Sequence, residues 1–126
     1  MSIKSYRELI VWQKSIQVCT ETYTLVSTFP KFEVYALADQ MRRASVSIAS
    51  NIAEGHNRNS TKHFLNFLSY SRSSVAELET QLIIANNLKY IDDEKLSLFL
   101  ESCNEIGKMI SGLEKSLKQK LQSPNP

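Results

Sequence analysis

The 126 residues are enough for one domain with a single hydrophobic core, but too few for two independent cores. Hydrophobic residues make up 42% of the chain and charged residues 22%, and no apolar run approaches the roughly 20 residues of a membrane span. The net charge of +2 is lower than that of most dedicated nucleic-acid-binding proteins. Because the amino terminus also lacks the features of a secretion signal, we expect a cytoplasmic protein with no membrane segment.

The first predicted helix covers residues 8–27, where apolar residues recur at spacings of three and four. Its predicted core-facing residues are Leu9, Trp12, Ile16, Cys19, Tyr23 and Val26. Trp12 and Tyr23 carry the largest apolar areas, so we expect both to anchor the core. Pro30 lies just after this segment and ends it, because proline disfavours helical geometry in the residue before it and has no N–H to donate.

The second predicted helix, residues 33–54, carries two different stripes at about 100° per residue. The apolar stripe consists of Leu37, Met41, Ile48 and Ile52. The neighbouring stripe, called here the polar band, consists of Gln40, Arg43, Ser47, Asn51 and Glu54. Buried polar groups left unpaired cost about 1–3 kcal/mol each, so we expect the band to contact a neighbouring helix or another subunit. An ion pair between Glu54 and Arg58 is a further structural alternative, and Gly55 is expected to end the helix.

The third and fourth predicted helices cover residues 61–86 and 93–121, and residues 122–126 are expected to form a frayed tail. Ser60 or Thr61 is predicted to cap the third helix, and Asp92 or Asp93 the fourth. Four long helices joined by short reversals predict an all-α fold. The specific prediction for residues 1–126 is one antiparallel up-down-up-down four-helix bundle.

No residue pattern indicates catalysis, so we expect a protein that is not an enzyme, with no catalytic residues and no cofactor. Cys19 and Cys103 lie far apart within helical patterns and are predicted to be reduced thiols of the core. His56 and His63 flank the second reversal without a suitable carboxylate partner, which is typical of solvated histidines. The chain is therefore expected to hold no metal.

Basic residues concentrate in two regions of the sequence. Between residues 42 and 72 the basic residues, opposed by Glu54 alone, are Arg42, Arg43, Arg58, Lys62 and Arg72. After residue 107 they are Lys108, Lys115, Lys118 and Lys120, opposed by Glu114 alone. Such runs are typical of solvated helix faces, and they are also what binding to RNA or DNA phosphates requires. The first set supplies the candidate nucleic-acid-binding residues.

Four blocks of sequence carry a resemblance to a known family. They are LIVWQKS at 9–15, FPKFEVYAL at 29–37, QMRRASVSIASNIAEG at 40–55 and FLNFLSYSRSSVAELETQL at 64–82. The chain resembles the small bacterial proteins encoded in intervening sequences of the 23S ribosomal RNA gene. The third block is the most specific, with its paired arginines followed by Ser-Ile and Asn-Ile-Ala-Glu-Gly.

The resemblance implies a four-helix bundle that assembles into a homopentamer and has no established enzymatic activity. A related branch, the accessory variability determinant of diversity-generating retroelements, forms a basic pentameric barrel that binds nucleic acid. It implies RNA or DNA as a partner here. Ala36 and Ser73 stand where many members carry glycine, and Ala49 stands where proline is frequent, so we expect a straighter second helix.

Two functions therefore remain open from the sequence. The first is a non-enzymatic, oligomeric module that binds nucleic acid through its basic residues. The second is a protein-interaction scaffold without nucleic acid, in which Tyr35 and the small residues of the second helix make subunit or partner contacts.

Overall fold

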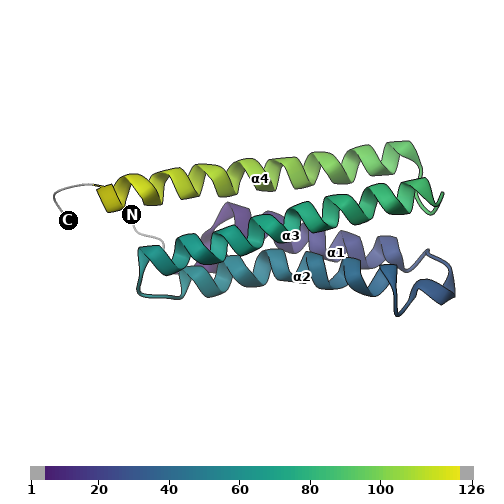
Figure 1. Ribbon diagram of the computed structural model, residues 1–126, viewed down its shortest axis with the longest axis horizontal. Helices are drawn as coiled ribbons and strands as arrows, with labels where there is room; N and C mark the ends of the chain where they lie inside the picture. The colour runs from purple at the N-terminus through teal and green to yellow at the C-terminus, as the bar shows by residue number, and fades with distance from the viewer. Residues whose placement is uncertain (1–4, 123–126) are drawn as a thin grey trace.

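The structure is a computed structural model that describes residues 5–122. The elements follow one another as η1 (Tyr6–Glu8), α1 (Ile10–Val26), η2 (Lys31–Glu33), α2 (Leu37–His56), α3 (Thr61–Asn87) and α4 (Asp93–Gln122). Successive long helices run in opposite directions, and residues 5–122 contain no strand (Figure 1). The predicted all-α four-helix bundle is therefore confirmed. Gln122 was predicted to begin the frayed tail of residues 122–126 but is the last residue of α4, and the rest of that tail lies outside the described residues.

The helix boundaries agree with the predicted ones except at the start of α2. That helix begins at Leu37 rather than near residue 33, because residues 31–33 form the separate short helix η2. Ser60 caps α3, since its Oγ accepts a hydrogen bond from the His63 N–H at 3.2 Å. Asp92 caps α4 through a 2.8 Å hydrogen bond from the Lys95 N–H to its Oδ1.

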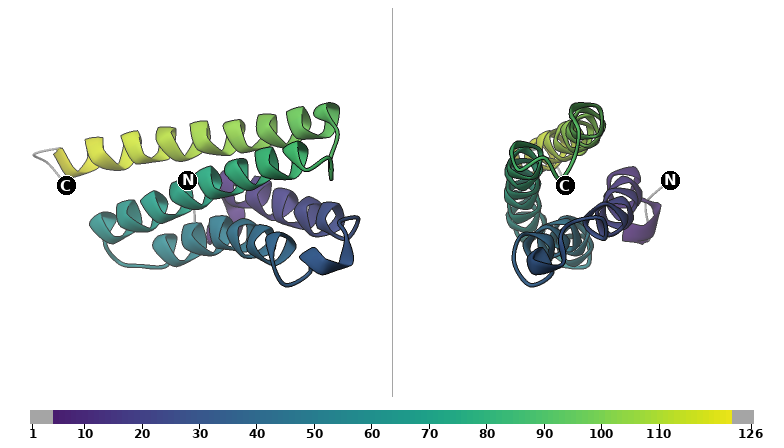
Figure 2. Two further views of the ribbon diagram at one scale, coloured as in Figure 1. Left: turned by 45° about the vertical axis from the view of Figure 1, so that its right-hand side comes forward. Right: turned by 90° about the vertical axis from the view of Figure 1, so that its right-hand side faces the viewer.

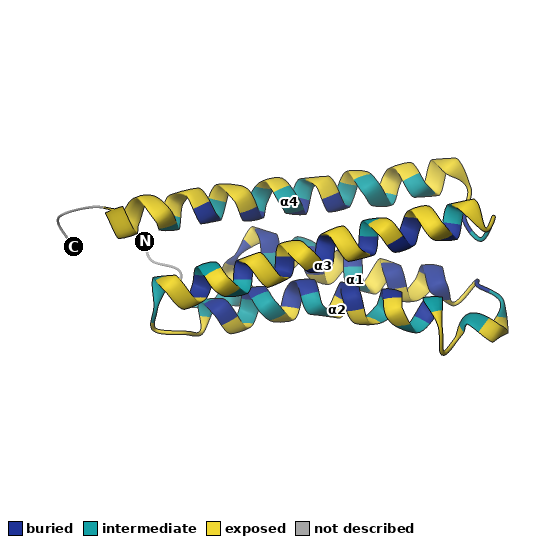
Figure 3. Cartoon of the chain, viewed as in Figure 1, coloured by how far each residue is buried: buried dark blue, intermediate teal, exposed yellow. Residues whose placement is uncertain are grey.

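The four helices form an open arc rather than a closed square. Viewed along the bundle, α2 and α3 lie in the middle of the arc, and α1 and α4 lie at its two ends (Figure 2). The α2–α3 pair is packed most extensively, whereas α1 and α4 make the weakest contact among the pairs of long helices that touch. Buried residues follow the inner face of every helix (Figure 3). The predicted apolar stripe of α2 is part of this core, with Met41, Ile48 and Ile52 fully buried.

The core-facing side of α1 differs from the predicted one. Tyr23 was expected to anchor the core, but 46% of its surface is exposed, and Ile16 is 40% exposed. Leu9 and Val26 are buried as predicted, but the rest of the buried side is formed by Val11, Ser15, Val18, Thr22 and Leu25. Ser15 and Thr22 can be buried because each hydroxyl donates to the carbonyl oxygen four residues earlier, at 2.7 and 2.8 Å. Trp12 is half-buried and packs edge-on against Tyr6.

Cys103 is fully buried among the core residues of α4, and both cysteines are free thiols. Burial, with a smaller contribution from the charge of Glu79, raises the pKa of the Cys103 thiol to about 12. The thiol therefore stays protonated at neutral pH and behaves as a small apolar side chain.

Gly55 does not end α2 by adopting a special backbone conformation, as the sequence had suggested. It lies within the helix, and none of the described glycines has a positive φ. Its role is steric, because a Cβ at this position would lie 2.7 Å from the Phe67 Cβ and 2.9 Å from Phe64 Cδ1. The missing side chain therefore lets α2 and α3 approach closely beside their turn.

We predict that Gly55→Ala lowers the free energy of unfolding by about 1–3 kcal/mol, because the added methyl group meets a Cβ that cannot rotate away. Gly112→Ala is the matched control, since that glycine also lies within a helix but has nothing within 4 Å of the added Cβ. The control should gain about 0.5–1 kcal/mol from helix propensity. Urea denaturation followed by circular dichroism measures both, and equal effects of the two variants would contradict the steric role.

Candidate nucleic-acid interface

The charges of the bundle are unequally distributed along its length. One end contains the α2–α3 turn, the start of α1 and the last turns of α4 (Figure 1). Residues 5–10, 50–70 and 115–122 are called here the basic end. They include six basic residues and two acidic ones. The basic residues are Arg7, Arg58, Lys62, Lys115, Lys118 and Lys120. At the opposite end, residues 20–40 and 88–101 contain three basic and seven acidic residues. Although the net charge is only +2, one end of the bundle is therefore positively charged and the other negatively charged.

Arg58 belongs to an aromatic cluster at the basic end. Its guanidinium carbon lies 4.9 Å from the centre of the Phe67 ring. Phe67 packs edge to face against Tyr70, with ring centres 5.7 Å apart. Tyr70 is 56% exposed, so the cluster presents both an aromatic surface and a cation to solvent. Together these groups can stack on a nucleobase and contact the neighbouring phosphate.

The structure separates the five basic residues predicted from the sequence. Arg58 and Lys62 lie at the basic end, in the α2–α3 turn and the first turn of α3. Arg42 and Arg43 lie near the start of α2, about 22 Å away along the helix at 1.5 Å per residue. The five residues consequently do not form one surface within a single chain.

Arg42 and Arg43 both interact with Asp39. Arg43 Nε lies 2.9 Å from one carboxylate oxygen, and the Arg42 guanidinium lies 3.5 Å from the other. Arg42 also donates a 2.8 Å hydrogen bond to the Val34 carbonyl oxygen, which ties the segment before α2 to the helix. Arg42 is therefore mainly a structural residue, whereas the Arg43 side chain is 80% exposed.

Arg72 makes an ion pair between α3 and α4. Its guanidinium pairs with the carboxylate of Glu114, whose side chain is only 10% exposed. A buried carboxylate needs such a partner, because removal from water penalises its charged form. The Arg72 side chain is still 52% exposed, but its charge is already compensated. Sequence reasoning could identify this arginine as basic but could not identify its partner 42 positions later.

The polar band of α2 divides into a half-buried part, Ser47 and Asn51, and an exposed part. Ser74 of α3 donates a 2.8 Å hydrogen bond to Ser47 Oγ, and Asn51 Nδ2 donates to the same oxygen at 2.9 Å. Gln40, Arg43 and Glu54 are exposed. Glu54 has no ion-pair partner in the described part of the chain, so the Glu54–Arg58 pair suggested by the sequence does not form. The half-buried part of the band thus joins α2 to α3 through Ser47.

Phe67 and Tyr70 are the residues of this interface that sequence reasoning missed. In the sequence, Phe67 broadens the apolar face of the third predicted helix, so its contact with Arg58 was not predicted. The available signal was their spacing of three, which places two aromatic rings on one face directly after a basic turn.

Across residues 5–122, no group of three or more His, Cys, Asp and Glu side chains could hold a metal ion. The same residues include no helix that is long and apolar enough to cross a bilayer.

The fold and its charges define a class of protein: small antiparallel four-helix bundles with a basic end. The profile of the 23S rRNA-intervening sequence proteins matches residues 7–112, and this chain belongs to that family. A crystal structure of a protein of unknown function from the S23 ribosomal protein family of Bacteroides thetaiotaomicron is similar, with a TM-score of 0.78 and 23% sequence identity. The match covers 84% of this chain and 96% of that one, and at this identity it supports the fold alone. No curated protein matches the sequence.

We predict that Arg72→Met lowers the free energy of unfolding by about 1–3 kcal/mol, because it leaves the buried Glu114 carboxylate unpaired. The double variant Arg72→Met/Glu114→Met removes both charges and should recover most of this loss. Chemical denaturation of the two single variants and the double variant measures the coupling. Additive losses would show that the ion pair does not brace α3 against α4.

Proposed function

We propose that this chain is a non-enzymatic, homo-oligomeric module of five copies that binds RNA through its basic end. The observation that carries the proposal is the position of the Arg58–Phe67–Tyr70 cluster among six basic residues at one end of the bundle. Cations supply affinity for phosphates, and exposed aromatic rings supply surfaces on which unpaired bases stack. Single-stranded RNA offers both groups to one surface.

The charge distribution also supports a defined orientation of the RNA. The acidic end repels phosphates while the basic end attracts them, so the potential favours approach from one direction. Arg58 and Lys62 are the residues of the original candidate set that we assign to this interface. Arg42, Arg43 and Arg72 all interact with carboxylates elsewhere in the bundle, and these negative charges weaken the attraction of the three arginines for phosphate.

The pentameric part of the proposal rests on the family resemblance. Five basic ends in one assembly would contact a single RNA at several points, so the effective concentration of each further site would be high. The affinity would then fall steeply with salt, because each neutralised phosphate releases counterions. The non-enzymatic part rests on the sequence, in which no catalytic spacing is found.

We predict that the protein binds a fluorescent single-stranded RNA, with an affinity at least 100-fold weaker at 300 mM salt than at 50 mM. Arg58→Ala/Lys62→Ala should weaken binding at least tenfold at 50 mM, and Tyr70→Ala about fivefold or more because it removes a stacking surface. Lys89→Asn is the matched control, since it removes an exposed lysine at the opposite end of the bundle and should change the affinity less than twofold. Salt-independent binding, or equal losses in Lys89→Asn, would argue against the proposal.

A protein-interaction scaffold is the second candidate, favoured by two exposed aromatic residues between α1 and α2. Tyr35 is 92% exposed and Phe32 is 77% exposed, which is unusual for large apolar side chains. The small residues of α2 do not support it equally. Ala44, Ser45 and Ala49 are already buried within this chain.

Light scattering of the purified protein is expected to give the mass of five chains of 14.4 kDa. If Tyr35 and Arg43 lie in a subunit contact, Tyr35→Ala/Arg43→Glu should dissociate the oligomer without loss of helix content. If that variant stays oligomeric and still binds RNA, this segment is not the contact and the scaffold function loses its support. A monomeric wild-type protein would contradict the proposed assembly.

A further inference from the structure

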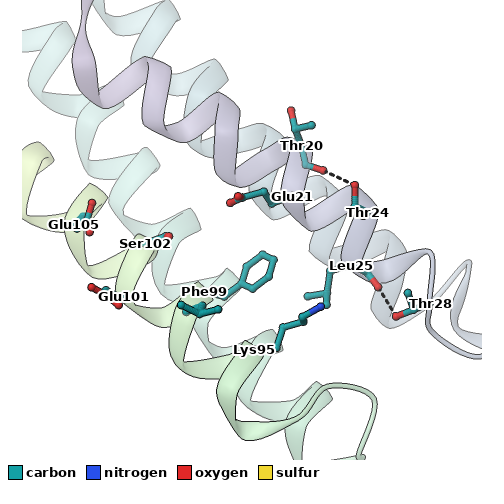
Figure 4. Close-up of a pocket in the computed structure, with 11 residues that line it drawn as sticks. Thr20, Glu21, Thr24, Leu25, Thr28, Lys95, Phe99, Glu101, Ser102 and Glu105 are labelled. Atoms are coloured by element: carbon teal, nitrogen blue, oxygen red, sulfur yellow. Dashed lines mark hydrogen bonds between the residues drawn. The ribbon is translucent and has the colours of Figure 1, made fainter.

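The open side of the bundle contains a groove between α1 and α4, which none of the proposed roles uses. Its volume is about 500 Å³, and its apolar residues are Leu25 from α1 with Leu98 and Phe99 from α4. Figure 4 shows Phe99 between the two helices, with Leu25 facing it from α1. Leu98 is 58% exposed, so the chain itself leaves this apolar surface uncovered.

The groove carries a local excess of negative charge. Glu21 of α1 faces Glu101 and Glu105 of α4 across it, and Lys95 is its single basic residue (Figure 4). Lys14 pairs with Glu105 at 2.6 Å, between Nζ and Oε2. The hydrogen bond that Lys14 donates to Glu105 raises the pKa of Lys14, and the negative charges of Glu21 and Glu101 add to the effect, so the three carboxylates act together on one amine. Glu21 and Glu101 have no ion-pair partner in the described part of the chain.

The shape of the groove fits a helix. It extends along α4 from Lys95 to Glu105, which is about 15 Å or three helical turns. An added helix would bury Leu98 and the exposed part of Phe99, and would cover the side between α1 and α4, which make the weakest contact among the pairs of long helices. Helices that bind in this way place apolar residues at positions i, i+3, i+4 and i+7 into the groove.

The charges of the residues that line the groove determine which kind of helix can bind there. A neutral or acidic helix would leave Glu21 and Glu101 near an apolar surface without partners, whereas lysine or arginine residues flanking the apolar stripe would pair with them. Nucleic acid and anionic lipid surfaces are disfavoured here by like charge. We infer that the α1–α4 groove is a docking site for a basic amphipathic helix of a partner protein.

This site is independent of the proposed RNA interface, because its acidic residues lie toward the opposite end of the bundle from Arg58. Binding of a basic helix would also reduce the negative charge of that end. Both ligands could therefore bind to one molecule at the same time.

A fluorescent peptide of about 16 residues, with leucines at i, i+3, i+4 and i+7 and lysines beside them, is the probe. We expect saturable binding at 50 mM salt, a gain of peptide helicity, and at least tenfold weaker binding of the same peptide with its lysines replaced by glutamates. Leu98→Lys places a cation in the groove and should weaken binding of the basic peptide at least tenfold. Ile83→Lys is the matched control, because it changes an apolar residue of α3 that is 45% exposed and lies outside the groove.

Circular dichroism and the thermal midpoint confirm that each variant is folded, and RNA binding by both variants should equal that of the wild type. Equal binding of the basic and acidic peptides, or full peptide affinity in Leu98→Lys, would overturn the inference. A wild-type protein that binds no peptide but becomes monomeric on Leu98→Lys would also overturn it, because the groove would then be a contact between copies. If the wild-type protein binds no RNA, that result would count against the proposed function and not against the proposed role of the groove.

Discussion

The close contact between α2 and α3 is the constraint on which the rest of the structure depends. At its turn end, Gly55 presents no side chain to Phe67, so the two backbones can approach. Further along, the hydroxyl of Ser71 donates to the Ile48 carbonyl oxygen at 2.7 Å, and Ser74 donates to Ser47. Small residues allow the two helices to approach closely, and the hydrogen bonds of Ser71 and Ser74 satisfy both buried hydroxyl groups across the contact.

Both candidate sites follow from this pairing. Because α2 and α3 are held closely, Phe67 lies beside their turn, where Arg58 can stack on it. The outer helices then pack on either side of the central pair and form an arc (Figure 2). The groove is lined by residues of α1 and α4, the two helices at the ends of this arc. The distribution of charge along the bundle gives the two places opposite character, so a phosphate-rich ligand and a basic helix would not compete.

The sequence predicted the number, direction and approximate bounds of the long helices, because apolar spacing and caps are local properties. The sequence-based prediction was wrong on α1 for a local reason and at Gly55 because of a residue farther along the chain. On α1, the apolar Tyr23 was expected in the core, but the self-satisfied hydroxyls of Ser15 and Thr22 allow the other face to be buried. Gly55 was identified as important, but its steric role needs the position of Phe67.

The candidate sites were predictable only in part. The basic character of Arg58 and Arg72 is evident from the sequence, but their different surroundings, one an aromatic ring and the other a buried carboxylate, are tertiary. The α1–α4 groove depends on how far the arc closes, which no local pattern encodes.

Native-state hydrogen exchange tests most directly whether the α2–α3 pair is the element that the others depend on. We predict that amides around Ile48 and Ser71 exchange only through global unfolding, while those of α1 and the last turns of α4 exchange through smaller openings at lower free energy. Exchange from α1 or the end of α4 as slow as that from the α2–α3 pair, or faster exchange within the pair, would contradict it.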